Sequence, residues 1–89
     1  MRNGSDLKRE AEKEIERMEG VFGSIEGEEG EVLRLARSYF EDSKYFFEKE
    51  DYLKSFEAAV ISWAYVDALL HFGKARIPKE LLKYFTVER

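Results

Sequence analysis

The sequence contains no cysteine, one proline and one histidine among its 89 residues. Without cysteine, the chain has no disulfides, thiolate zinc sites or cysteine nucleophiles. The longest run without Lys, Arg, Glu or Asp extends only from Ala58 to Val66, far below the roughly 18–20 residues that cross a bilayer. The charged N-terminus does not look like a signal peptide. These features favour a cytoplasmic protein with no membrane partner.

Aromatic residues are plentiful, with one Trp, five Tyr and seven Phe. A chain this short buries only about 60–65% of its unfolded surface, and each aromatic side chain adds roughly 150–250 Å² to that burial. We therefore expect one domain, residues 1–89, with an aromatic core.

The net charge of -4 is unevenly distributed. Residues 1–31 carry ten acidic and five basic side chains, whereas residues 74–89 carry two acidic and five basic ones. An acidic total makes nucleic acid an unexpected partner, because binding to phosphates needs clustered Lys and Arg. The basic tail, with Lys74, Arg76, Lys79 and Lys83, is only a weak hint of one. We expect it to balance the acidic segment within one chain or between two.

The stretch from residue 52 to 72 predicts the central helix. At about 100° per residue, its apolar side chains form two opposite faces. The front contains Tyr52, Phe56, Ala59, Trp63, Val66 and Leu70, and the back contains Ala58, Ile61, Tyr65, Ala68, Leu69 and Phe72. A helix that is apolar on opposite sides needs neighbours on both. Asp51 is the expected N-cap, and Gly73 is expected to end the helix.

Three other helices are expected, over residues 6–19, 31–49 and 78–86. The first has a narrow apolar stripe, which favours packing on the chain's own core over a coiled coil because the repeat lasts barely two heptads. The second is apolar over an arc of about 160° and forms an antiparallel hairpin with the central helix through a tight turn at Glu50–Asp51. The last is short, begins at Pro78 and contributes Leu81, Leu82 and Phe85.

Four glycines between residues 20 and 30 predict a flexible connection after the first helix. The neighbouring acids Glu26, Glu28 and Glu29 would repel phosphate, so this segment is not a phosphate-binding loop. The predicted fold is all-α, an up-down-up three-helix bundle with a short fourth C-terminal helix.

Several short patterns between Tyr39 and Gly73 are similar to a known family. They are the aromatic–x–Asp–x–Lys–Tyr–Phe pattern within Tyr39 to Phe46, the Lys–x–Asp turn at Lys49–Asp51, Ser–Phe–x–Ala–Ala from Ser55, and Tyr–Val–Asp–Ala from Tyr65. Together they resemble an archaeal family of short helical proteins known as domain of unknown function 357. Where that family tends to have glycine before the turn aspartate, this chain has Glu50. The resemblance implies a small helical bundle and an archaeal source, and it implies no activity.

Asp67 is the one acid on the inner turns of the central helix, and His71 follows it by four residues. The pair could form half of a metal site or an acid–base pair, but a metal needs three or four ligands. The nearest other acid in this helix, Glu57, lies ten residues away. Buried acids usually have structural partners, so we predict a protein hydrogen-bond partner for Asp67 and no metal. No catalytic constellation is present, which predicts a protein that is not an enzyme and has no cofactor.

Two functions remain open. The first is a non-enzymatic protein–protein interaction module that uses the back of the central helix, namely Ile61, Tyr65, Ala68 and Phe72. The second is a small-ligand or metal-dependent site around Asp67 and His71. The short fourth helix could cover the end of the back face nearest Phe72. The remainder would be an open apolar patch, which predicts a homodimer or a protein partner.

Overall fold

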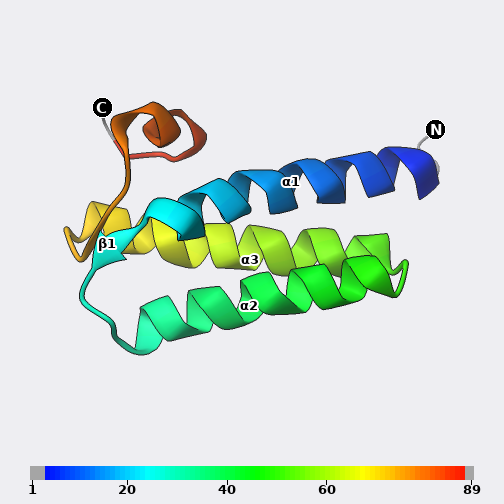
Figure 1. Ribbon diagram of the computed structural model, residues 1–89, viewed down its shortest axis with the longest axis horizontal. Helices are drawn as coiled ribbons and strands as arrows, with labels where there is room; N and C mark the ends of the chain where they lie inside the picture. The colour runs from blue at the N-terminus through cyan, green and yellow to red at the C-terminus, as the bar shows by residue number, and fades with distance from the viewer. Residues whose placement is uncertain (1–3, 88–89) are drawn as a thin grey trace.

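A computed structural model of the protein describes residues 4–87 and places three long helices side by side (Figure 1). Helix α1 spans Gly4–Ser24, α2 spans Glu31–Glu48 and α3 spans Tyr52–His71. Strand β1 (Glu26–Gly27) pairs with strand β2 (Ala75–Arg76), and the 3₁₀ helix η1 (Lys79–Tyr84) follows. The predicted all-α bundle with up-down-up helices and a short C-terminal helix is confirmed.

Helix α3 is the centre of the bundle. It packs extensively against both α1 and α2, which contact each other much less, and Figure 1 shows it between them. The core joins all three helices to the C-terminal segment through buried apolar residues, namely Met18, Val21, Ala36, Phe40, Val66, Leu70, Ala75 and Phe85. The central position follows from the composition of α3, which is apolar on more than one side.

The ends of α3 are those that the sequence predicts. The Asp51 side chain accepts a hydrogen bond from the backbone N–H of Lys54 at 3.2 Å, so it caps the first turn. Gly73 follows the helix with φ +69°, and the Lys74 N–H donates to the Leu69 carbonyl at 2.9 Å. This pattern is a Schellman motif, which needs a left-handed residue at this position.

Buried serines hold α2 close to α3, which the sequence analysis did not foresee. Ser55 Oγ donates to the Ser43 carbonyl at 2.7 Å, and Ser62 Oγ donates to the Ala36 carbonyl at 2.7 Å. Each serine is fully buried, and none has an unsatisfied hydroxyl. Because these side chains are small, the two helices pack along a seam of serine and alanine instead of large apolar residues.

The predicted end of the first helix, at residue 19, was wrong. Helix α1 continues through Gly20 and Gly23 to Ser24, and Val21 is completely buried. Gly in a helix interior costs about 1 kcal/mol relative to Ala, whereas burying one large apolar side chain contributes about 1.5–3 kcal/mol. Val21, Phe22 and Ile25 continue the apolar stripe of the helix, and their burial outweighs the two glycines.

The connection between α1 and α2 is also more ordered than a flexible loop. Glu26 pairs with Arg76, and Gly27 pairs with Ala75, in an antiparallel arrangement. A Cβ atom at Gly27 would overlap the Lys74 carbonyl oxygen and lie 2.8 Å from the Ala75 Cα. Glycine is therefore required where the two backbones meet. In this connection, Ile25 and residues 28–30 lie outside both strand and helix.

The C-terminal segment packs on the front of α3 and not on the end nearest Phe72, so that expectation was wrong. The Trp63 and Phe85 rings stack with centroids 5.8 Å apart and planes 7° from parallel. Trp63 Nε1 donates to the Tyr84 carbonyl at 2.7 Å. The helix in this segment is 3₁₀ over Lys79–Tyr84, shorter than the predicted 78–86. Phe72 remains 76% exposed.

Candidate functional site

Asp67 and His71 meet at the C-terminal segment. Asp67 Oδ1 accepts from the Thr86 N–H at 2.9 Å, and Asp67 Oδ2 accepts from the Thr86 hydroxyl at 2.6 Å. His71 Nε2 lies 2.7 Å from the same hydroxyl and 3.8 Å from Asp67 Oδ2. The predicted protein partner of Asp67 is confirmed, and it is Thr86.

Asp67 and His71 on α3 hold Thr86 of the C-terminal segment, and we call these three residues the Asp67 cluster, or the clasp. Both carboxylate oxygens accept hydrogen bonds from Thr86, and the Asp67 side chain is only 15% exposed. Within residues 4–87, no group of three His, Cys, Asp or Glu side chains is arranged to hold a metal ion. The cluster joins the C-terminal segment to α3 at the point where the chain folds back.

A second candidate is the apolar face of α3 that neither α1 nor η1 covers. Of the four residues predicted for it, Phe72 is 76% exposed and Ile61 is 39% exposed, while Tyr65 and Ala68 are half-buried. The other residues of the predicted back, Ala58 and Leu69, are buried or half-buried. The structure thus divides the back of α3 into a covered part and an open part.

Side chains of α2 extend the exposed apolar surface of α3. The Tyr39 ring stacks on the Tyr65 ring with centroids 6.0 Å apart. At about 100° per residue, Val32 and Leu35 lie on the same flank of α2 as Tyr39, and each is 39% exposed. Val32 and Leu35 belong to the apolar arc that the sequence predicts for α2, and the sequence alone did not indicate their exposure. We call the surface formed by Val32, Leu35, Tyr39, Ile61, Tyr65, Ala68 and Phe72 the open face.

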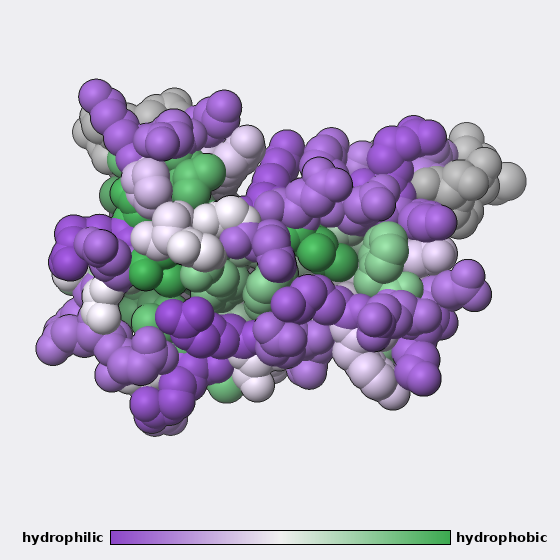
Figure 2. Space-filling model, viewed as in Figure 1, coloured by the Kyte–Doolittle hydropathy of each residue, from purple (hydrophilic) through white to green (hydrophobic). Residues whose placement is uncertain are grey.

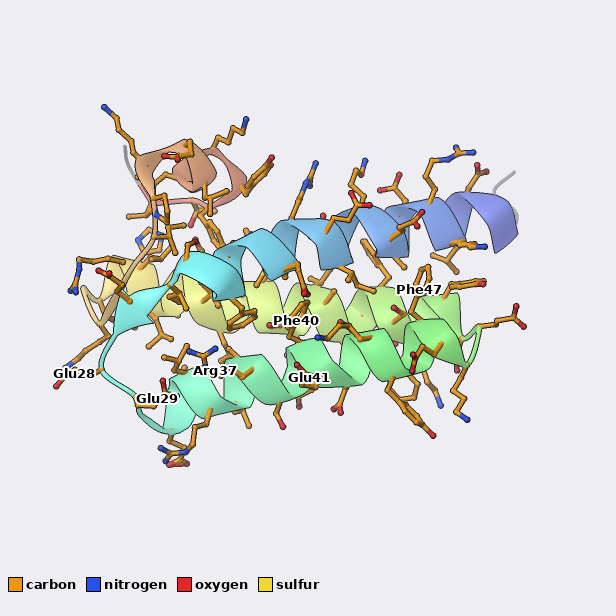
Figure 3. The ribbon with its side chains drawn as sticks, in the orientation of Figure 1. Glu28, Glu29, Arg37, Phe40, Glu41 and Phe47 are labelled. Carbon is orange, nitrogen blue, oxygen red and sulfur yellow. The ribbon has the colours of Figure 1, made fainter. Side chains whose placement is uncertain are left out.

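A third surface is the groove between α1 and α2. Figure 2 shows an apolar strip there, between charged side chains of both helices. One hollow in this groove is about 450 Å³ and is lined by Ile15, Glu41, Lys44, Tyr45, Phe47 and Glu48. Phe40, Glu41 and Phe47 are labelled on α2 beside this groove in Figure 3.

The chain's own cations cover the aromatic floor of that groove. The Phe22 and Phe40 rings stack with centroids 5.0 Å apart. The Arg37 guanidinium lies 5.4 Å from the Phe22 centroid, and Lys44 Nζ lies 4.5 Å from the Phe40 centroid. Lys44 also forms an ion pair with Glu41 at 3.2 Å. Of the two apolar surfaces, the open face is therefore the less protected.

Two cations of the basic tail have partners within the chain. Arg76 Nη2 lies 3.8 Å from Glu26 Oε1, so it balances the acidic segment within the chain. Lys83 Nζ lies 5.4 Å from the centre of the Tyr84 ring. None of the helices within residues 4–87 has the length and apolar character needed to cross a membrane.

Comparisons with known proteins agree with the fold. Residues 6–75 match the model of a family described as a protein of unknown function, DUF357. The chain is also similar to the crystal structure of protein AF1782 from Archaeoglobus fulgidus, of the same family, with 39% sequence identity and a TM-score of 0.76. That similarity covers 84% of this chain and 97% of the other. Among curated proteins, none matches the sequence. The open face lies inside the matched residues, whereas Thr86 lies beyond them.

Proposed function

This chain belongs to the DUF357 family, and from that premise we propose that it is a non-enzymatic protein–protein interaction module whose binding surface is the open face. The observation that carries this proposal is Phe72, a large aromatic side chain that is 76% exposed at the end of the central helix. Soluble monomers rarely expose contiguous apolar patches above a few hundred Å². Phe72 belongs to the open face, together with the partly exposed Ile61, Val32 and Leu35.

The charge pattern of α3 supports the same surface. Asp67 is the only charged residue between Glu57 and His71, and its carboxylate faces Thr86 of the C-terminal segment. The stretch of α3 that reaches solvent along the open face is therefore free of charge over about 20 Å, at 1.5 Å per residue. Surfaces that bind protein partners are depleted in charge at their centre and enriched in aromatic residues.

The energetics favour binding through a small number of residues. Complete burial of one Phe, Ile or Leu side chain contributes about 1.5–3 kcal/mol. Phe72 retains most of that contribution because it is 76% exposed, and Ile61, at 39%, retains a smaller part. A partner that covers both, together with Leu35, would gain several kcal/mol, which is the scale at which a few residues dominate an interface.

Photo-crosslinking tests the proposal. A photoreactive benzoylphenylalanine replaces Ile61 in the full chain, and a matched control carries it at Glu12, an exposed position on α1. After irradiation in native lysate, we expect the residue-61 variant to join a protein, either this chain or another one, and the residue-12 control to give no such product. Equal labelling from both positions, or none from position 61, would show that the open face is not a binding surface.

A further inference from the structure

The exposed side of α3 has a repeat that is symmetric about Ala64. Glu57, Ala64 and His71 are seven residues apart, so they lie almost in line along one side of the helix. All three are exposed. An acidic side chain therefore stands two turns before Ala64, and a histidine stands two turns after it.

We propose that a second copy of this chain docks on the exposed side of α3 that carries Glu57, Ala64 and His71, next to the open face, with its α3 antiparallel to this α3 and a two-fold axis at Ala64. The proposal rests on the proposed function and names the partner. In this arrangement, a residue that precedes Ala64 by a given number of positions faces the residue that follows Ala64 by the same number in the partner subunit. Glu57 then faces His71 of the partner subunit, and the same pair forms again at the other end. Isologous pairing of this kind is the commonest route to a homodimer.

The shapes at the centre suit a close approach. Ala64 meets Ala64 of the partner subunit, and the exposed Val60 faces Ala68 of the partner subunit. Small side chains at a contact allow helix axes to approach to about 8 Å, the lower end of the usual range. The larger Val60 side chain then has a small residue opposite it, which avoids overpacking near the crossing point.

The charges at the two ends are available for this pairing. Glu57 has no ion pair or hydrogen bond with any residue of the described chain. The Thr86 hydroxyl donates its hydrogen bond to Asp67 Oδ2. The hydrogen bond between His71 Nε2 and Thr86 Oγ1 must therefore be donated by the ring. In a protonated His71, Nδ1 is the second donor and is free to bind a carboxylate, with Asp67 and Thr86 fixing the ring orientation. Glu57 of the partner subunit supplies that carboxylate.

Sedimentation equilibrium of the purified full chain tests the pairing through a charge reversal and its rescue. His71→Glu places two carboxylates opposite each other at both ends, and we expect it to weaken the dimer at least tenfold. The double variant Glu57→Arg with His71→Glu restores opposite charges, and we expect its dissociation constant to return to within about threefold of the wild type. A His71→Glu defect that Glu57→Arg does not rescue would overturn the proposed register.

A second variant avoids the clasp. Ala64→Arg lies at the proposed axis and away from Thr86, so it should abolish the dimer while the Trp63 fluorescence and the far-UV circular dichroism stay those of the folded chain. A wild-type chain that is monomeric at tens of micromolar would overturn the proposal. If position 61 then still crosslinks another protein in lysate, the open face binds a different partner, and the proposed function stands without the homodimer. If position 61 crosslinks nothing, both fail.

Discussion

At the scale of single residues, Glu50 is held in a backbone conformation that glycine prefers. Its φ is +62°, in the left-handed region, which costs a residue with a side chain about 1–2 kcal/mol. The tight turn between α2 and α3 imposes this conformation, since Asp51 next to it must cap α3. The resemblance to a family that tends to have glycine at this position fits the geometry.

Glu50→Gly should therefore stabilise the protein by about 0.5–1 kcal/mol, the relief of strain being partly offset by the greater freedom of glycine in the unfolded chain. The matched change at the other end of α3 is Gly73→Ala, where φ is +69°, and it should destabilise by about 1 kcal/mol. Urea denaturation followed by circular dichroism gives both values. Changes of the same sign at both positions would contradict this account.

Asp67 is the other residue whose effect can be isolated. Asp67→Ala removes the acceptor of two Thr86 hydrogen bonds, and we expect it to cost about 1–3 kcal/mol. Thr86→Val removes the hydroxyl bonds with Asp67 Oδ2 and His71 Nε2 but keeps the N–H bond to Asp67 Oδ1, so the Asp67 carboxylate still holds the Thr86 backbone. Trp63 is the only tryptophan and stacks on Phe85, so its emission should shift to the red when the C-terminal segment is released. An Asp67→Ala variant with wild-type stability and unshifted emission would show that the clasp holds nothing.

At the scale of elements, Gly20 and Gly23 in α1 can be compared with Gly27 in β1. A Cβ atom at Gly20 or Gly23 would meet nothing within 4 Å, whereas one at Gly27 would overlap the backbone of β2. Gly20→Ala should therefore stabilise by about 0.5–1 kcal/mol through helix propensity, and Gly27→Ala should destabilise by opening the β1–β2 pairing. Thermal unfolding of the two variants separates the effects. Destabilisation by Gly20→Ala would mean that α1 ends where its glycines begin.

Local signals made α2 and α3 predictable to within one residue. Asp51 and Gly73 mark the ends of α3 by their own chemistry, and the broad apolar arc marks α2. The end of α1 was not predictable from its glycines, because the burial of Val21 and Phe22 depends on where α2 and α3 lie. The β1–β2 pair joins residues far apart in the sequence, and short-range patterns do not contain that information.

The candidate sites, too, could be predicted only in part from the sequence. The sequence identified Asp67 as needing a partner, but Thr86 lies 19 residues further along the chain and no periodicity connects them. The back of α3 was identified as surplus apolar surface, and the structure shows that Ile61 and Phe72 are the exposed part. Which part would stay open depended on the path of the C-terminal segment, which turns toward Trp63.

At the scale of the whole molecule, the open face should contribute to association and very little to folding. Phe72→Ser changes a side chain that the chain itself does not bury, so at nanomolar concentration its unfolding free energy should stay within about 0.5 kcal/mol of the wild type. Phe40→Ala, a change at a side chain that is 5% exposed, should cost about 3–5 kcal/mol.

The wild type and Phe72→Ser should differ in stability at high protein concentration. Because association stabilises the folded state by mass action, the wild type should gain stability between nanomolar and micromolar protein, and Phe72→Ser should gain none. An equal loss from Phe72→Ser at both concentrations would mean that Phe72 packs within its own chain and is not an interface residue.

The most direct test of the pairing of α3 with its copy is a single cysteine at the proposed axis, in a chain that has no other. With axes 8–10 Å apart and Cα atoms at a radius of about 2.3 Å, facing Cα atoms lie about 3.4–5.4 Å apart, which overlaps the range a disulfide spans. Under mild oxidation at micromolar concentration, Ala64→Cys should form a covalent species of twice the 10.5 kDa chain mass, while Glu12→Cys stays monomeric. An Ala64→Cys chain that crosslinks no faster than Glu12→Cys would contradict the account.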